Sequence, residues 1–345
     1  MPPSTPTRIA ILGIGQMGLV CAGVLAGKPG FDLVMWGHSI DESGDLTQTR
    51  TSPRLKGFTL PDSVRVTHDL KKAVADADLV VSSVPVQFIR DVWTQIRATK
   101  SLPARAGAVS VAKGIENATL LRPTQIIADA LADDPDARPR PLGVLSGPTI
   151  AAELARGLPA TMIAASDAPG FAADIQRLFS ASYLRIYTHE DVVGVELAGA
   201  MKNVIAIAAG VLDGLQAGNN AKSALLARGL AEITRLGVAM GASTETFFGL
   251  AGVGDLATSC FSPEGRNRSL GEALGRGEKL DAYLKRTQYV VEGVATARSV
   301  VELAAKFRVD MPITHVVHAA LFEGLDPIEG IGRLMSREQK AERVG

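Results

Sequence analysis

The sequence lacks a surplus of charge of either sign and contains few cysteines. Its 345 residues include 36 lysines and arginines against 36 aspartates and glutamates, whereas binders of nucleic acids or anionic membranes need a basic excess. Cys21 and Cys260 are too few for a disulfide scaffold and belong to no Cys/His cluster that would hold a metal. The first residues also lack the apolar stretch of a signal peptide. We therefore expect a cytoplasmic protein with no nucleic-acid partner and no metal.

Hydrophobic residues are plentiful, and only one apolar run is long enough to span a bilayer. At 46% hydrophobic and 21% charged residues the chain can form a large core, and its length predicts two domains. The apolar run, residues 192–215, contains Glu196, Lys202, Asn203 and Asp213. Charged residues near a bilayer centre cost about 2.5–3.5 kcal/mol each. The run is therefore predicted to be a buried helix of a soluble protein, with no membrane span.

The order of elements predicts an α/β fold. From residue 8 to about 188, short runs rich in Val, Ile and Leu alternate with helical stretches, which is typical of a parallel sheet covered on both faces. The predicted strands are Arg8–Leu12, Asp32–Met35, Asp78–Val84, Ala108–Ala112, Leu142–Leu145 and Thr161–Ala164. After about residue 189 only helical patterns follow. We expect a Rossmann-like, doubly wound dinucleotide-binding domain over residues 1–188 and an all-α substrate-binding and catalytic domain over residues 189–345.

A glycine motif follows the first predicted strand. Residues 13–18 spell G-x-G-x-x-G at the start of a helix. In a Rossmann fold the first glycine permits a tight turn, the second lets the backbone approach the pyrophosphate, and the third lets helix and strand pack closely. Gly13, Gly15 and Gly18 are therefore predicted to bind a dinucleotide at the helix N-terminus. The alternative is a glycine-rich turn in another α/β fold.

The end of the second predicted strand should select the cofactor, because an acidic residue there holds the ribose hydroxyls of NAD. Residues 35–39 occupy that place, and no acid appears before Asp41. A 2′-phosphate is therefore tolerated, with His38 as its partner and Trp36 as a platform for the adenine. The sequence predicts NADP or NAD and favours NADPH only slightly, since no arginine stands beside His38. The alternative for Trp36 is that it merely closes the core.

Lys202 interrupts an almost wholly apolar helix, where a charge needs a reason. Burial disfavours the ammonium form of a lysine, which makes it a usable acid or base near neutral pH. One helix face combines a polar pair with small residues and could receive a small ligand. That face consists of Gly199, Lys202, Asn203, Ala206 and Gly210. The alternative is a lysine paired with Glu196 or extended to the surface, with the small face packed on another helix.

Further polar groups follow later predicted strands. Lys113 comes just past one strand, at the edge of the sheet where the glycine motif lies, so it could meet a substrate oxygen. Residues 146–149, Ser-Gly-Pro-Thr, follow the next strand and offer N–H groups and hydroxyls. An ordinary N-cap and turn before the next helix, residues 150–155, is the alternative for this segment.

Two segments of the helical half combine glycine with charge. Residues 252–255 place Asp255 in a glycine-rich turn, and residues 262–267 are typical of an N-cap, a first-turn proline and a helix start. Arg266 and Asn267 would suit a phosphate there, because a guanidinium, an amide donor and the helix dipole act together. Surface capping alone is the alternative.

Together these motifs resemble the bacterial-type NAD(P)-dependent glycerol-3-phosphate dehydrogenases. The resemblance extends over nearly the whole chain, and the motifs of the helical half are the most specific in combination. The matching segments are Gly13–Gly18, Lys113-Gly114, Ser146–Pro148, Val195–Asn203, Gly249–Asp255, Arg266-Asn267 and Val291–Gly293.

The resemblance implies a set of site residues. Lys202 would donate and accept the proton, Lys113 would touch both cofactor and substrate, and Asp255 would hold Lys202 in position. The substrate-binding positions are Lys113, Gly147, Thr149, Lys202, Asp255, Gly265, Arg266 and Asn267. The cofactor positions, besides the three glycines and Trp36, are Gln16, Met17, His38, Lys113, Ala151, Arg266, Val290 and Glu292. The family usually has serine where Gly265 and Thr149 stand, so one hydroxyl contact is missing here and one is kept.

The function implied is the reversible NAD(P)H-dependent reduction of dihydroxyacetone phosphate to sn-glycerol 3-phosphate, which feeds glycerophospholipid synthesis. Two alternatives remain open. Another β-hydroxyacid-type dehydrogenase, such as a ketopantoate or 3-hydroxyisobutyrate enzyme, would prefer a carboxylate substrate and would not need Arg266 and Asn267 at a helix start. A non-catalytic nucleotide sensor would bind the cofactor without turnover and would leave Lys202 unexplained. The apolar helical half suggests a homodimer.

Overall fold

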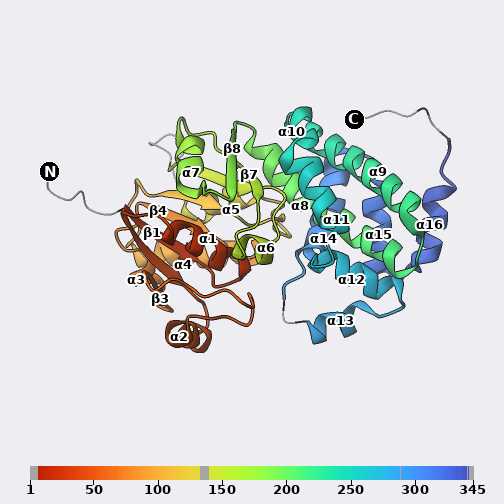
Figure 1. Ribbon diagram of the computed structural model, residues 1–345. Coiled ribbons are helices and arrows are strands. Elements are labelled where there is room, and N and C mark those ends of the chain that lie inside the picture. The colour runs from red at the N-terminus through yellow and green to blue at the C-terminus, as the bar shows by residue number, and fades with distance from the viewer. Residues whose placement is uncertain (1–6, 133–139, 288, 340, 342–345) are drawn as a thin grey trace. The chain divides into compact units, whose positions relative to one another are not determined.

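The structure is a computed structural model that describes residues 7–132, 140–287, 289–339 and 341 (Figure 1). Its contacts divide the chain into two compact units. The sheet unit comprises residues 1–112 and 123–192, and the helical unit comprises residues 113–122 and 193–345. The functional division into a cofactor domain, residues 1–188, and a catalytic domain, residues 189–345, stays a prediction. The contacts add that residues 113–122 belong with the helical unit.

The sheet unit contains an eight-stranded sheet in the order β3-β2-β1-β4-β5-β6-β7-β8. The order reverses between β1 and β4, and doubly wound folds bind their ligands at the carboxyl ends of the strands at such a point. The strands are β1 (Thr7–Leu12), β2 (Phe31–Trp36), β3 (Val64–Thr67), β4 (Leu79–Ser82), β5 (Gly107–Ser110), β6 (Leu142–Ser146), β7 (Ala160–Ala165) and β8 (Leu184–His189).

All six predicted strands are present, and two more strands form the sheet edges. The central strands are mostly buried, whereas β3 has a single buried residue and β8 alternates buried and exposed residues before an exposed end, so both lack the continuous apolar run that marks a covered strand. The prediction of a parallel sheet is wrong for one pair, because β6 and β7 run antiparallel. Strand composition does not show direction, since either pairing buries the same side chains.

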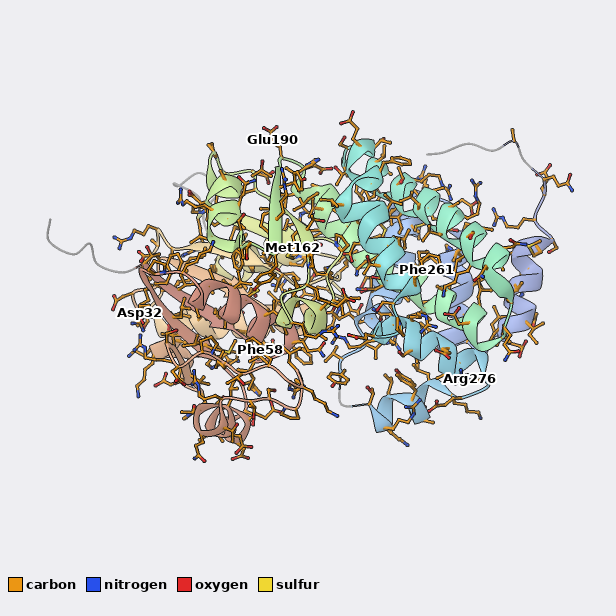
Figure 2. The ribbon with its side chains drawn as sticks, in the orientation of Figure 1. Asp32, Phe58, Met162, Glu190, Phe261 and Arg276 are labelled. Atoms are coloured by element: carbon orange, nitrogen blue, oxygen red, sulfur yellow. The ribbon has the colours of Figure 1, made fainter. Side chains whose placement is uncertain are left out.

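Helices cover both faces of this sheet (Figure 1). One layer holds α1, which contacts both α6 and α7, and another holds α4, which contacts both α3 and α5. Phe58, labelled in Figure 2, comes from the segment between α2 and β3 and packs on α1, where a Cβ on Gly23 would lie 2.9 Å from its ring. The helices are α1 (Gln16–Ala26), α2 (Ile40–Thr49), α3 (Leu70–Val74), α4 (Val86–Thr99), α5 (Pro123–Leu131), α6 (Ala151–Ala155) and α7 (Phe171–Phe179).

The helical unit is built around α8 (Val192–Gly214). By length and composition this helix could cross a membrane, yet 89% of its most apolar window is buried in the protein, as in the core helix of a folded unit. The other elements are α9 (Gly218–Ala239), α10 (Thr244–Phe248), the π-helical turn η1 (Leu250–Gly254), α11 (Asp255–Phe261), α12 (Arg266–Gly275), α13 (Leu280–Arg286), α14 (Glu292–Phe307), α15 (Pro312–Phe322) and α16 (Pro327–Met335).

Glycines let α8 and α12 pack in close contact. A Cβ on Gly210 would overlap the carbonyl oxygen of Arg268, and a Cβ on Gly271 would overlap that of Ile207. The face of α8 that was predicted to receive a ligand is therefore partly covered by a neighbouring helix, as the alternative held. What remains of that face for chemistry is the pair Lys202 and Asn203.

Residues 113–122 are held by the helical unit through specific bonds. The hydroxyl of Ser299 on α14 donates to the carbonyl of Ile115 at 3.1 Å and contacts Oδ1 of Asn117 at 2.5 Å. Arg122 pairs with Glu196 on α8, and both side chains are largely buried. These bonds fix the segment that carries Lys113.

Candidate active site

The glycine-rich loop of the sheet unit has the shape that a dinucleotide needs. Gly13 has a φ of +103°, in the left-handed region that favours glycine. A Cβ on Gly18 would overlap the carbonyl oxygen of Gly13, so only glycine lets α1 start this close to the loop. A Cβ on Gly15, the N-cap of α1, would meet nothing within 4 Å, and no side chain caps the helix. The start of α1 therefore has no capping side chain and leaves room beside Gly15, which fits a pyrophosphate.

The loop is fixed by its neighbours on the sheet. Ser83, directly after β4, donates its hydroxyl to the carbonyl of Leu12 at 2.6 Å and lies 3.1 Å from that of Gly13. The side chain of Gln16 donates to the carbonyl of Arg54 at 2.8 Å. Gln16 and Met17 are half-buried at the start of α1. The loop is thus prearranged, and binding need not order it.

At the end of β2, the contacts of Trp36 distinguish a platform for adenine from a residue that closes the core. Trp36 is 4% exposed, and its indole N–H donates to the carbonyl of His68 at 3.0 Å. These contacts favour the alternative that Trp36 closes the core rather than offering a face to adenine. His38 is exposed, with its ring 6.0 Å from that of Trp36, so it stays available to a cofactor.

The Ser-Gly-Pro-Thr segment forms a turn after β6. Gly147 has a φ of +134°, and the hydroxyl of Thr149 donates to the carbonyl of Gly147 at 3.2 Å. The N-cap of α6 is Ile150, without a side-chain bond, so the cap of the alternative is absent while its turn is present. Ser146 is buried, and its hydroxyl has no hydrogen-bond partner among the residues that the structure describes. Ala151 begins α6 beside this turn.

In the helical unit, Lys202 is fixed by two groups of α11. Its side chain is 8% exposed, and its Nζ lies 2.6 Å from Oδ1 of Asp255 and 2.5 Å from the hydroxyl of Ser259. Asp255 and Ser259 are four residues apart, so one helix face presents both. The pairing with Glu196 is absent, because Glu196 pairs with Arg122. The structure thus excludes the lysine pairing and the surface extension of the purely structural alternative, whereas its packing of the small face on another helix is present.

A second lysine reaches the same carboxylate. Nζ of Lys113 lies 2.6 Å from Oδ2 of Asp255, whose side chain is only 1% exposed. The pKa of Lys113 is lowered to about 8, mainly by burial and also by the charge of Lys202, against the opposing effects of Asp255 and Glu292. Each oxygen of one buried carboxylate therefore holds a different lysine.

An amide chain connects this cluster to two helix starts. The side-chain nitrogen of Asn203 lies 3.3 Å from the carbonyl of Lys113, and its oxygen accepts a bond of 2.9 Å from Asn267. The oxygen of Asn267 in turn accepts the N–H of Gly293 at 2.9 Å. Asn267 therefore links α8, α12 and α14, in addition to the phosphate role predicted for it.

Arg266 and Glu292 lie at the starts of α12 and α14. The guanidinium of Arg266 is exposed and donates to the carbonyl of Val290 at 3.2 Å. Desolvation raises the pKa of Glu292, and the charges of Arg266, Lys113 and Lys202 oppose that rise. These predicted cofactor positions therefore lie in the electrostatic reach of the lysine cluster.

The predicted helix start at Ser262 is wrong. Ser262 is the C-cap of α11, and α12 begins four residues later at Arg266 with Gly265 as its N-cap. The hydroxyl of Ser262 accepts the N–H of Glu264 at 3.2 Å, which makes a turn instead of a helix. Because glycine has no side chain, nothing caps α12, and its free N–H groups suit a phosphate.

The structure brings together the predicted residues of each unit. In the helical unit the cluster joins Lys113, Lys202, Asp255, Gly265, Arg266, Asn267, Val290 and Glu292, and in the sheet unit the glycine loop, His38 and the Ser-Gly-Pro-Thr turn lie at carboxyl ends of strands. Sequence reasoning missed Ser259, although its spacing from Asp255 was a signal. Within residues 7–132, 140–287, 289–339 and 341, no group of His, Cys, Asp and Glu could hold a metal.

Two family models match the chain. One is described as the N-terminus of NAD-dependent glycerol-3-phosphate dehydrogenase and matches residues 8–172. The other is described as the C-terminus of the same enzyme and matches residues 191–332. A Staphylococcus aureus (strain JH9) protein named glycerol-3-phosphate dehydrogenase, NAD(P)+, is 42% identical over 337 residues, which cover 97% of this chain and 100% of that protein.

Solved structures of glycerol-3-phosphate dehydrogenases are also similar to this chain. A glycerol-3-phosphate dehydrogenase from Coxiella burnetii has a TM-score of 0.91 at 32% identity, covering 97% of this chain and 100% of that one. One from Saccharomyces cerevisiae has a TM-score of 0.79 at 26% identity, covering 96% and 100%. A ketopantoate reductase from Ralstonia eutropha has a TM-score of 0.59 at 16% identity, covering 94% and 99%. The last likeness is one of fold alone.

Proposed function

Because the chain belongs to the NAD-dependent glycerol-3-phosphate dehydrogenase family, we propose that it catalyses the reversible NAD(P)H-dependent reduction of dihydroxyacetone phosphate to sn-glycerol 3-phosphate. The observation that carries this proposal is the buried carboxylate of Asp255 with a lysine on each oxygen. Reduction places a hydride on the carbonyl carbon and a proton on its oxygen. When bound, the reduced nicotinamide supplies the hydride.

Lys202 acts as the general acid. Its Nζ is held by Asp255 and Ser259, which leaves one of its three N–H bonds for the substrate oxygen. The developing alkoxide takes that proton, and in the reverse direction the neutral amine removes it from the hydroxyl. Asp255 is the positioning group, since it keeps the ammonium in one orientation.

Lys113 supplies positive charge to the same oxygen. Charge that is already oriented in a poorly hydrated site stabilises a developing alkoxide without reorganisation during the reaction. Two lysines against Asp255 leave one net positive charge in the cluster, which suits an anionic transition state. The low pKa of Lys113 shows that it loses its own proton more easily than an ordinary lysine.

The substrate phosphate binds at the start of α12. The uncapped N–H groups after Gly265 and the exposed guanidinium of Arg266 form an anion site of the usual kind. Asn267 holds α12 against α8 and α14 and presents its backbone N–H in the first turn. In the sheet unit, Gly147 and Thr149 are proposed to contact the substrate, and Gln16, Met17, His38 and Ala151 the cofactor.

The two alternatives are weaker. A ketopantoate-type enzyme shares only the fold, and family models of glycerol-3-phosphate dehydrogenase match both halves of the chain. A non-catalytic sensor would not need two lysines on one buried carboxylate.

We further propose a cytoplasmic homodimer in glycerophospholipid synthesis. Its exposed Val238, Ile328 and Met335 are apolar contacts for a second copy, and its two cysteines are free.

The test is absorbance at 340 nm with purified protein, dihydroxyacetone phosphate, and NADPH or NADH. Oxidation that depends on dihydroxyacetone phosphate, and not on ketopantoate, is the expected result. Folded protein that binds NADPH but oxidises it with neither substrate would favour the sensor. Light scattering with size-exclusion chromatography would report the dimer, and a monomer at micromolar concentration would contradict it.

A further inference from the structure

We propose that Arg54 recognises the 2′-phosphate of NADP(H) and that Glu42 competes with the phosphate for it. The proposal rests on the dehydrogenase function only in assuming that the glycine loop binds a nicotinamide dinucleotide. No arginine is close to His38 in the sequence, but the fold supplies one from the segment between α2 and β3.

The backbone of Arg54 is fixed next to the glycine motif. Its carbonyl accepts the side chain of Gln16, the first residue of α1, at 2.8 Å. Its neighbour Leu55 is 2% exposed, and Phe58 packs against α1 at Gly23 (Figure 2). The segment is therefore anchored against the helix whose N-terminus would hold the pyrophosphate.

The guanidinium of Arg54 extends to the start of α2. Its Nη2 lies 2.6 Å from Oε1 of Glu42, a residue of the first turn of α2. The N–H of Glu42 donates to the hydroxyl of the N-cap Ser39 at 3.2 Å, and Ser39 comes three residues after the end of β2. In Rossmann folds the adenosine ribose lies at that strand end. Arg54 thus bridges the pyrophosphate loop and the ribose position.

Charge explains why Glu42 is a competitor. Residues 36–40 contain no acid, so nothing there serves the ribose hydroxyls of NAD as an acidic residue does in NAD-specific sites. Glu42 pairs with Arg54 through a carboxylate that carries one negative charge. A phosphate monoester carries a charge of about −1.5 to −2 and accepts two parallel N–H bonds from a guanidinium, so it is the stronger partner. Both side chains are partly exposed, at 35% and 47%, so either can turn without disturbing the core.

The test measures binding of two fragments, adenosine 2′,5′-bisphosphate and AMP, by calorimetry. Arg54→Gln should lower the affinity for adenosine 2′,5′-bisphosphate by about tenfold or more, as the loss of a charged bidentate contact does. The affinity for AMP should change by less than about twofold. The matched control is Arg65→Gln. Arg65 pairs with Asp32 at 2.6 Å, an ion pair at the opposite, amino-terminal edge of the sheet, and this variant should bind both fragments as the parent does.

Glu42→Gln tests the competition. This variant frees Arg54 and removes a charge that repels the phosphate, so the affinity for adenosine 2′,5′-bisphosphate should rise by about threefold or more. The ratio of kcat/KM for NADPH to that for NADH should also rise. Arg54→Lys should keep part of the preference. Equal losses of both fragments in Arg54→Gln, or weaker bisphosphate binding in Glu42→Gln, would overturn the proposal. Unlike the kcat/KM ratio, the fragment affinities do not depend on turnover, so they test the proposal independently of the proposed reaction.

Discussion

Two buried lysine clusters in the helical unit look alike and yet differ in chemistry. The side chains of Lys202 and Lys222 are each only 8% exposed, and each is paired with an aspartate at less than 3 Å. Asp255 holds Lys202 and also Lys113, whereas Asp213 holds Lys222 and also Arg268 at 2.6 Å. Each aspartate therefore serves two cations.

The second cation makes the difference. Here the second cation is an arginine: Arg268 also pairs with Glu272 at 3.4 Å, and Glu272 pairs in turn with Arg276, so this cluster continues into a network of arginines and carboxylates. The ring of Phe261, labelled in Figure 2, lies 5.0 Å from Nζ of Lys222. In the other cluster both cations are lysines, and the pKa of Lys113 falls to about 8. A buried lysine alone is thus a weak sign of catalysis; a shared carboxylate with two titratable partners is a stronger one.

Removing the amine of each lysine should separate the clusters most clearly. Lys202→Met should lower kcat by about 100-fold or more, because acid–base catalysis contributes at least that much, while circular dichroism shows an intact fold. Lys222→Met should lower the free energy of unfolding by about 1–3 kcal/mol and leave kcat of the folded enzyme nearly unchanged. Near-normal turnover in Lys202→Met would disprove its assignment as the acid.

The aspartates offer the next comparison. Asp255→Asn leaves two lysines without a counter-charge and loosens Lys202, so kcat/KM for dihydroxyacetone phosphate should fall by about 10-fold or more. Asp213→Asn should reduce stability in urea unfolding without a comparable loss of kcat/KM. If both variants lost activity equally, the two clusters would not differ in the way proposed.

The pH profile tests Lys113. A lysine with a pKa of about 8 is charged below that pH and neutral above it, so kcat/KM for the reduction should decline above pH 8, approaching tenfold per pH unit. Lys113→Arg keeps its charge, and its decline should begin at higher pH. An identical alkaline limb in the variant would assign the ionisation to another group.

Glu232 extends the comparison to a buried acid without a directly bound cation. It accepts the N–H groups of Ile313 and Thr314 at 2.7 and 3.2 Å, and burial raises its pKa to about 7. The native state therefore keeps this proton between pH 4.5 and 7 where the unfolded chain loses it, so its contribution to stability decreases as pH rises through that window. Unfolding of Glu232→Gln in urea should show a weaker pH dependence there, and an unchanged slope would contradict the assignment.

Much of the fold was readable from the sequence because its signals are local. The six covered strands and the long apolar α8 are continuous apolar runs, and the glycine motif has a fixed spacing. The edge strands β3 and β8 and the antiparallel β6–β7 pair were not predicted, since short half-exposed strands and strand direction leave little local trace. The start of α12 was misplaced because Ser262 and Pro263 also suit the turn they actually form.

The chemical groups of the site are already visible along the chain: a glycine loop for phosphate, a lysine in an apolar helix, an acid in a glycine-rich turn, and an Arg-Asn pair near a helix start. Their partners are known only from the folded protein. In the fold, Lys202 pairs with Asp255 and Ser259 instead of Glu196, and Lys113 pairs with the other oxygen of Asp255. Trp36 is buried, and Arg54 lies near the end of β2. The physical reason is that secondary structure depends on neighbours along the chain, whereas pairing and burial depend on residues tens to hundreds of positions apart.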